Sequence, residues 1–340
     1  MKNTGGKNKQ TKQTKQTKQT KQTKPNRQNK QDKHWISEID FSNLMDLRID
    51  YAFKLIFGSK KHLFLISLLN AIFANKKIPR IIKSLTIENP YLEKQSKEGK
   101  TSVLDIRAIL DDDSTILIEM HLYDIEDLKY KTIRSWARAY GDELESGQKY
   151  SIQPPVICVT FADDSLDDSK SQKIHKCCKI MDIDDNTVFT DALELHYIDM
   201  KAFVKAINKT GDITDIGNIG NTGTKNTGKG ETIDSMLAKW LAVITEKDIK
   251  DKRIIENICK EEGEIGMAVS TLVKLSEDKL TRQEYLKRQD DILLASKRDN
   301  DYKIMERTVK QEKRRAERAE RASEEKDAII AQLKAQLGIK

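Results

Sequence analysis

The chain has 340 residues, of which 37% are hydrophobic and 34% are charged. This apolar content suffices for one sizeable core, so the charge-rich parts are expected to be tails, linkers or solvated helices. No stretch approaches the roughly 18 consecutive apolar residues of a transmembrane helix, and no apolar segment follows the basic N-terminus as in a signal peptide. The sequence therefore predicts no membrane partner and favours a cytoplasmic protein.

The net charge of +7 is concentrated in an N-terminal tail. Residues 1–33 hold eleven Lys or Arg and one Asp, so the tail carries +10 and the remainder −3. Residues 9–24 repeat Lys-Gln-Thr, a polar pattern that cannot bury enough surface to offset its ordering entropy. We predict a disordered basic tail over residues 1–34. It is either a simple-sequence expansion or a string of lysines that neutralises phosphates.

The cysteines are interpreted as reduced thiols. Cys158 lies in an apolar run, where a thiol behaves as a small hydrophobe. Cys177 and Cys178 are adjacent and lack the two-residue gap of a zinc knuckle. His175 and His196 are interpreted as surface or structural residues.

Hydrophobic spacing predicts the following elements in chain order. They are helices over 44–57 and 63–73, strands over 103–110 and 115–121 joined by a turn at 111–114, a helix over 130–144, a strand over 156–161, a strand with a short connection over 193–203, a helix over 235–244 and a long charged helix from about 301.

Composition divides the chain further. Residues 35–206 are predicted to form the first folded domain, and a flexible linker rich in Gly, Asn and Thr follows over 207–231. Residues 232–300 are predicted to be a helical region. Residues 301–340 form a long charged helix, which is either a short coiled coil or a solvated single helix.

Two acids lie in the most apolar part of the predicted hairpin. Asp105 follows Val-Leu and Glu119 follows Ile-Leu-Ile, where unpaired charge is costly. Glu119 and His121 are two residues apart and share one strand face. A three-residue loop over 111–113 pairs Asp105 with Glu119, whereas an even loop places Asp105 on the other face. Two carboxylates held together need a cation, and oxygen ligands suit Mg²⁺. The alternative is a half-exposed hairpin whose polar residues face water.

Several motifs carry a resemblance to a known family. They are Asp50-Tyr-Ala-Phe-Lys-Leu-Ile-Phe-Gly58, Leu68-Leu-Asn-Ala-Ile72, Leu104-Asp-Ile106, Ile118-Glu-Met-His121, Gly147 with Tyr150, Pro155-Val-Ile157 and Leu195-His-Tyr-Ile-Asp199. In order and spacing they resemble the Rpn family of recombination-promoting nucleases and putative transposases, within the PD-(D/E)xK superfamily. The resemblance covers roughly half of the chain.

The resemblance implies an α/β fold in which helices flank a mixed sheet, so that residues 35–206 form a nuclease domain. It also implies Mg²⁺-dependent DNA endonuclease activity with catalytic Asp105, Glu119 and His121. Asp105 and Glu119 ligate the metal in this interpretation, together with the backbone carbonyl of Met120. Asp50 is a candidate accessory acid, although an exposed ion pair with Lys54 is the favoured interpretation.

The position of His121 departs from the family pattern, which has Gln there, while the wider class has Lys. Histidine is either a cation or a neutral donor and acceptor near neutral pH. It could orient water, ligate a metal with a preference for Mn²⁺, or mark an impaired site. The alternative function is therefore a catalytically impaired DNA-binding or interaction protein from a mobile element. Lys54 and Arg134 are candidate phosphate contacts, DNA is the expected partner, and the C-terminal helix offers a route to a homo-oligomer.

Overall fold

A computed structural model describes most of the chain. The described residues are 34–59, 62–74, 80–88, 91–92, 102–103, 105–122, 127–142, 144, 147–163, 173–214 and 233–337. The chain divides into two units, residues 1–38 and 39–340. The described part of the first unit is the short 3-10 helix η2 (His34–Glu38). The predictions of disorder for residues 1–33 and of a linker from residue 215 lie outside the described residues.

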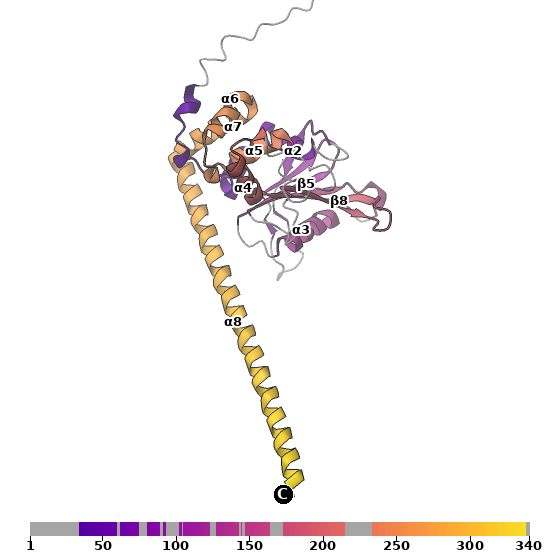
Figure 1. Cartoon of the computed structure of the whole chain (residues 1–340). Coiled ribbons are helices and arrows are strands. Elements are labelled where there is room, and N and C mark those ends of the chain that lie inside the picture. The colour runs from indigo at the N-terminus through magenta and orange to yellow at the C-terminus, as the bar shows by residue number, and fades with distance from the viewer. Residues whose placement is uncertain are drawn as a thin grey trace, which may run out of the picture. The chain divides into compact units, whose positions relative to one another are not determined.

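The second unit contains both helices and strands, and its chain ends in a run of helices (Figure 1). The α-helices are α1 (Asp50–Phe57), α2 (Leu63–Ala74), α3 (Leu128–Asp142), α4 (Met200–Thr210), α5 (Ser235–Ile244), α6 (Arg253–Glu261), α7 (Gly263–Glu277) and α8 (Lys279–Leu337). The strands are β1 (Leu85–Glu88), β2 (Tyr91–Leu92), β3 (Ser102–Val103), β4 (Ile106–Leu110), β5 (Thr115–His121), β6 (Val156–Ala162), β7 (His175–Met181) and β8 (Val188–Asp199). The described residues of this unit also include the 3-10 helices η3 (Phe41–Asn43), η4 (Tyr150–Ile152) and η6 (Glu246–Asp248).

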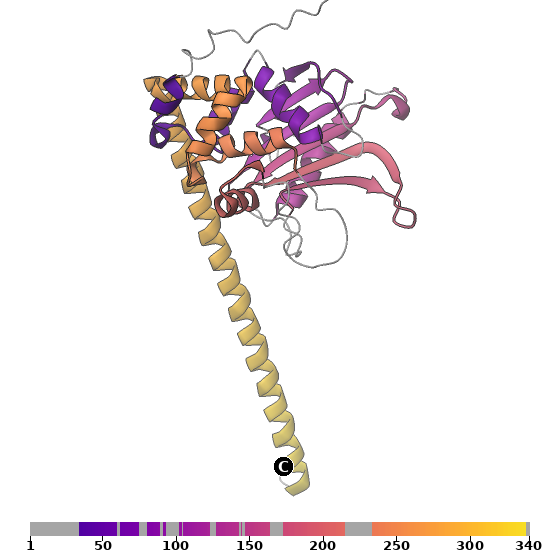
Figure 2. The ribbon, with the colours of Figure 1, turned by 45° about the horizontal axis from the view of Figure 1, so that its top comes forward.

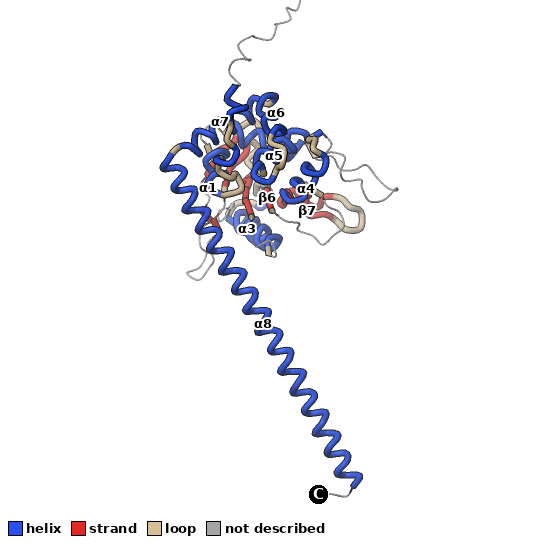
Figure 3. The backbone as a smooth tube through the Cα atoms, turned by 60° about the vertical axis from the view of Figure 1, so that its left-hand side comes forward, coloured by secondary structure: helices blue, strands red, loops and turns tan. Residues whose placement is uncertain are grey.

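The main sheet is mixed and has the strand order β1-β4-β5-β6-β8-β7. The central strands β5, β6 and β8 run parallel, and the outer pairings are antiparallel. All of β6 and nearly all of β5 are buried, as expected of parallel strands covered on both faces. Figure 3 shows the strands enclosed by helices. This arrangement confirms the predicted α/β fold.

Different helices cover the two faces of the sheet. On one face, Leu117, Cys158 and Leu195 form a cluster with Ala139 and Trp136 of α3. On the other face, α1 packs Phe53 against Phe161 of β6, with ring centroids 5.9 Å apart. Helix α2 places Phe73 against His196 of β8 on the same side, at 5.0 Å. The sheet therefore lies between α3 and the α1–α2 layer.

The helices that follow residue 232 extend the α1–α2 layer. Trp240 of α5 is fully buried, lies 5.4 Å from the ring of Phe57, and donates its indole N–H to Ser67 Oγ at 3.2 Å. Figure 2 shows these helices gathered beside the sheet, and α8 continuing beyond them. The second half of the chain is thus part of the same unit as the sheet.

Helix α8 is longer than the sequence predicts, because it begins at Lys279 rather than near Asp301. Its first turns contact α7 and α1. Almost every residue from Asp301 to Gln332 is exposed, in agreement with the many charged side chains in this part of the helix. Within the described residues, none of the helices combines the length and the apolar character that a bilayer span needs.

Two further predicted boundaries are wrong. Residues 44–49 are not helical, because the Asp46 carboxylate accepts the Arg48 backbone N–H at 2.9 Å and holds a turn before α1. Residues 200–210 form α4, so the first residues of the predicted linker are helical. Asp199 starts this helix by accepting the Ala202 N–H at 2.7 Å, and Gly211 ends it with a φ of 70°.

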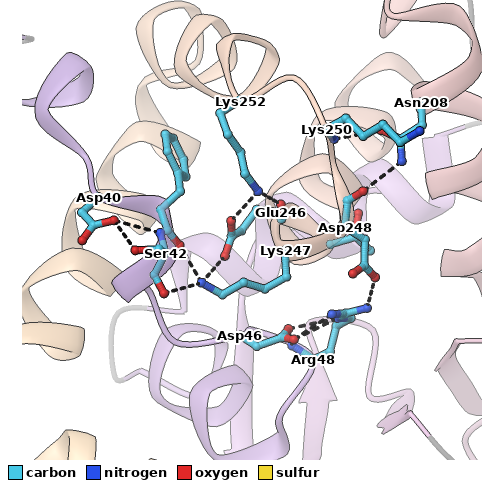
Figure 4. Close-up of polar contacts among 12 residues, drawn as sticks. Asp40, Ser42, Asp46, Arg48, Asn208, Glu246, Lys247, Asp248, Lys250 and Lys252 are labelled. Carbon is cyan, nitrogen blue, oxygen red and sulfur yellow. Dashed lines mark hydrogen bonds and ion pairs between the residues drawn. The ribbon is translucent and has the colours of Figure 1, made fainter.

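A polar network joins the turn before α1 to the segment after α5 (Figure 4). Arg48 pairs with Asp46 at 2.8 Å and also with Asp248. Glu246 is 2% exposed and lies 3.0 Å from Lys247 and 3.1 Å from Lys252. Buried carboxylates are stable only with such partners, so this network fixes the entry into α1.

Candidate active site

The hairpin formed by β4 and β5 has the register that is expected for a loop with an odd number of residues. Leu110 donates its backbone N–H to Ser114 at 2.9 Å, which leaves a three-residue loop. The last loop residue, Asp113, has a φ of 63°, a left-handed conformation that aspartate tolerates well. Ile106 lies opposite Ile118, and continuing this register by one residue places Asp105 opposite Glu119. The predicted three-residue loop is confirmed.

Both carboxylate oxygens of Glu119 have partners. The residue is buried, with 9% of its surface exposed. Its Oε1 accepts a hydrogen bond from Ser135 Oγ of α3 at 3.1 Å, and its Oε2 lies 2.9 Å from His121 Nε2. Residues two apart on a strand project from one face, so His121 reaches the acid directly. Helix α3 and β5 together fix the orientation of this carboxylate.

Asp105 lies immediately before β4 and is held at the end of the hairpin. Its Oδ2 accepts the Met120 N–H at 2.6 Å, and its Oδ1 lies 3.4 Å from Lys54 Nζ of α1. Burial raises the pKa of Asp105 to about 6, and the Lys54 charge and the Met120 N–H limit that rise. The ionised carboxylate is therefore costly at this position, and an added cation would stabilise it.

The backbone of β5 directs a carbonyl toward Asp105. The Thr115 N–H donates to the Pro155 carbonyl before β6, and the His121 carbonyl accepts from the Asp163 N–H after β6. The backbone groups of the odd-numbered residues of β5 therefore point toward β6. Even residues therefore face β4, and Met120 does so through its N–H to Asp105. The N–H and C=O of one strand residue point to the same side. The Met120 carbonyl is thus directed to the side on which Asp105 lies.

Asp50 belongs to a chain of ion pairs that ends at the site. It starts α1 and lies 3.6 Å from Lys54, the pair that the sequence suggests. The closer partner is Arg288 of α8, whose Nε and Nη2 each lie 2.7 Å from an Asp50 oxygen. Although burial opposes it, the Arg288 hydrogen bonds and the charges of Arg288 and Lys54 lower the pKa of Asp50. Sequence reasoning missed Arg288 because the contact spans 238 positions.

A further acid lies beside the end of β5. Asp163 follows β6, donates its backbone N–H to the His121 carbonyl at 3.0 Å, and lies 3.7 Å from Arg48. Burial raises the pKa of Asp163, and the Arg48 charge opposes this. The sequence offers no periodic signal for this residue, because it lies just beyond a uniformly apolar strand.

The predicted phosphate contacts occupy different settings. Lys54 lies between Asp50 and Asp105, with a third of its side chain exposed. Arg134 is exposed on α3, next to the Ser135 that contacts Glu119. The ion pairs connect Lys54 to both acids, whereas Arg134 lies on the solvent side of its helix.

The donor set at this site suits a hard divalent cation. Asp105, Glu119 and the Met120 carbonyl supply oxygen ligands, and burial makes the Asp105 charge depend on a cation. Within the described part of the chain, one set of three His, Cys, Asp or Glu residues has ligand atoms all within 4.8 Å of one another. That set is Cys177, Glu194 and His196 rather than the predicted trio.

Comparison with known proteins identifies the family. The sequence model described as PD-(D/E)XK nuclease family transposase matches residues 47–307. Since this match covers more than half of the chain, the protein belongs to that family. Searches of curated proteins and of solved structures found no significant match.

Proposed function

We propose that the protein is a metal-dependent DNA endonuclease of the recombination-promoting type. The observation that carries the proposal is the placement of Asp105 and Glu119 on the two arms of one hairpin, with His121 in contact with Glu119 and Lys54 beside Asp105. Family membership supports a nuclease-like function. The proposal adds three features to this family-level function, which are metal dependence, endonucleolytic cleavage and DNA as the partner.

Asp105, Glu119 and the Met120 carbonyl would hold Mg²⁺, or Mn²⁺ in its place. Such an ion, when bound, stabilises charge on the phosphate and lowers the pKa of an attacking water. The protein contributes orientation, since Ser135 and His121 fix Glu119 while the Met120 N–H fixes Asp105. Lys54 and Arg134 would place the DNA backbone through phosphate contacts.

His121 has two roles compatible with its geometry. Its Nε2 lies 2.9 Å from Glu119 Oε2, so it can hold that carboxylate by donating a hydrogen bond. In its neutral form it can instead receive a proton at Nε2 from water near the site. Both roles keep the residue in the catalytic set together with Asp105 and Glu119.

Plasmid cleavage by the purified full-length protein tests the function. We expect supercoiled DNA to become nicked or linear with Mg²⁺ or Mn²⁺ and to stay intact with a chelator. Cleavage that persists in chelator contradicts metal dependence. The absence of cleavage with either ion, together with retained DNA binding, favours the alternative below.

The alternative is an impaired nuclease that binds DNA or another partner without cutting. Two contacts favour this alternative, because the side chains of Lys54 and His121 lie against Asp105 and Glu119, where a metal ion would bind. Fluorescence anisotropy with labelled DNA distinguishes it, because binding without hydrolysis is its expected result.

Helix α8 is the proposed route to a homo-oligomer. Val309 and Ile330 are apolar residues of this helix, and 63% and 49% of their surfaces are exposed. A coiled coil with a second copy of the chain would bury them. Light scattering of the protein with and without residues 301–340 tests this part, and equal oligomeric states contradict it.

A further inference from the structure

A cluster of metal-ligating side chains lies at the opposite edge of the sheet from β1. Cys177 of the edge strand β7 lies directly opposite His196 of β8 in the antiparallel register. Glu194 precedes His196 by two residues and therefore shares its strand face. Glu194 and His196 are buried and Cys177 is half-buried, so the three side chains meet in an enclosed space rather than on the open surface.

The distances within this cluster suit one ion of the zinc type. Cys177 Sγ lies 3.8 Å from Glu194 Oε1 and 4.0 Å from His196 Nε2, and these two atoms are 2.8 Å apart. A point equidistant from the three atoms lies roughly 2.1 Å from each, within the range of about 2.0–2.3 Å for bonds from zinc to S, N and O ligands. No rearrangement of the strands is needed to reach this geometry.

Neighbouring side chains orient the ligand atoms. Lys179 Nζ lies 3.1 Å from Glu194 Oε2, which leaves Oε1 directed at Cys177 and His196. His175 Nε2 lies 2.9 Å from His196 Nδ1. Beside the Glu194 carboxylate, His196 Nε2 carries the proton in the metal-free site. A bound ion would take the place of that proton, and Nδ1–H would then donate to His175, an arrangement common at histidine ligands of zinc.

The chemical types of the three donors also suit zinc. A buried carboxylate beside a thiol and an imidazole is the mixed donor set that zinc takes.

The cluster is separate from the candidate active site. Glu119 lies beside Thr160, and Thr160 beside Tyr197, so these side chains share one sheet face. His196 is the residue before Tyr197 and projects from the other face, against Phe73 of α2. A metal bound by His196 would thus be on the opposite side of the sheet from Glu119.

We propose that Cys177, Glu194 and His196 form a zinc-binding site, with solvent as the fourth ligand. Binding releases the thiol proton of Cys177 to solvent and involves no change of oxidation state. The ion would fasten the edge strand β7 to β8, where unpaired strand edges are otherwise prone to open or to associate. Such a site has a structural role and is independent of DNA cleavage.

Cobalt titration of the metal-stripped, full-length protein tests this site. We expect a thiolate-to-cobalt charge-transfer band that saturates at one equivalent and disappears when zinc is added. The band should be absent in Cys177→Ser and in Glu194→Gln. Cys178→Ser is the matched control, because Cys178 is the adjacent, exposed thiol, and it should keep the band. Wild-type protein without the band, or Cys177→Ser with it, overturns the proposal.

Alkylation of the wild-type protein gives a second test that does not depend on a variant. Zinc coordination suppresses the reaction of a thiolate with alkylating reagents. We expect zinc to protect Cys177 and leave Cys178 reactive, as read by mass spectrometry of the two labelled positions. Equal labelling of Cys177 with and without zinc shows that the residues form only a hydrogen-bonded network and rejects the site.

Discussion

At the scale of single residues, Asp105 and Glu119 belong to the two arms of one hairpin but have different surroundings. Glu119 has a hydroxyl and an imidazole at its oxygens, whereas Asp105 is held by a backbone N–H and a lysine at 3.4 Å. The pKa of Asp105 is raised to about 6 by burial. The ionised form of Asp105 would therefore be stabilised by a bound cation.

This shift predicts how Asp105→Asn changes stability in the presence of a chelator. Because the folded-state pKa is raised, the contribution of Asp105 to stability is greatest below its unfolded-state pKa of 3.8 and is lost as the pH rises to about 6. Asparagine stays neutral and avoids this loss. At pH 8 the variant should be more stable by up to about 3 kcal/mol, since one pKa unit corresponds to about 1.4 kcal/mol. Urea denaturation at pH 4 and pH 8 measures this, and a variant that is less stable at pH 8 contradicts it.

His121→Gln restores the residue type of the resembling family at this position. Glutamine can still donate a hydrogen bond to Glu119 Oε2, the contact that histidine makes at 2.9 Å. We expect the variant to keep the divalent-dependent cleavage rate or to raise it. The measurement is the initial rate with Mg²⁺ and with Mn²⁺. A loss of cleavage leaves the carboxylates as the site and shows that histidine has a chemical role of its own.

At the scale of elements, the hairpin could be predicted in detail because local signals agree there. Branched apolar runs flank three aspartates, and the loop length alone decides which face Asp105 joins. The edge strand β7 could not be predicted, since His-Lys-Cys-Cys-Lys-Ile-Met lacks apolar alternation. This segment is a strand because it pairs with β8, not because of a pattern in its own sequence. For the same reason the Cys177 cluster could not be found from spacing along the chain.

The contact between α8 and α1 is another feature that local sequence could not predict. Arg288 binds Asp50 through two nitrogens, each at 2.7 Å. It thereby connects the C-terminal helix to the helix that carries Lys54. Both residues of this contact lie within the family match, which extends to residue 307, well beyond the sheet.

Arg288→Ala tests this connection. We expect a loss of about 1 kcal/mol at pH 7, a small value because the Arg288 side chain is 46% exposed and water screens the pair. The pKa of Asp50 is lowered, so its stabilisation is present above the unfolded-state pKa and disappears as the pH falls through the folded-state value. The difference from wild type should therefore shrink below about pH 4. Arg298→Ala, an exposed site on the same helix, is the control, and an equal effect there contradicts the assignment.

At the scale of the whole molecule, composition predicted a linker and a separate helical region where the structure shows one unit. Residues 39–340 cluster together, and Ser276 accepts the Met45 N–H at 2.9 Å across 231 positions. The run rich in Gly, Asn and Thr resembles a domain boundary in composition. Composition cannot reveal that apolar faces on both sides of the run, such as those of α2 and α5, pack together.

The basic tail gives a prediction at this scale. Residues 1–33 carry eleven basic residues against one acid. Each phosphate that the tail neutralises contributes about 0.9 to the slope of log affinity against log salt. Deleting residues 1–33 should lower non-specific DNA affinity and flatten this slope. Anisotropy titrations at several salt concentrations measure both quantities, and an unchanged slope contradicts a role of the tail in DNA binding.

The most direct test of the proposed active site is the initial rate of Mg²⁺-dependent plasmid cleavage by Asp105→Asn and Glu119→Gln. Each change removes one charged ligand and keeps the size of the side chain. Asp191→Asn, the same change at an exposed position of β8, serves as the control. The account predicts loss of divalent-dependent cleavage in both site variants and a wild-type rate in the control. A wild-type rate in Asp105→Asn or in Glu119→Gln would contradict it.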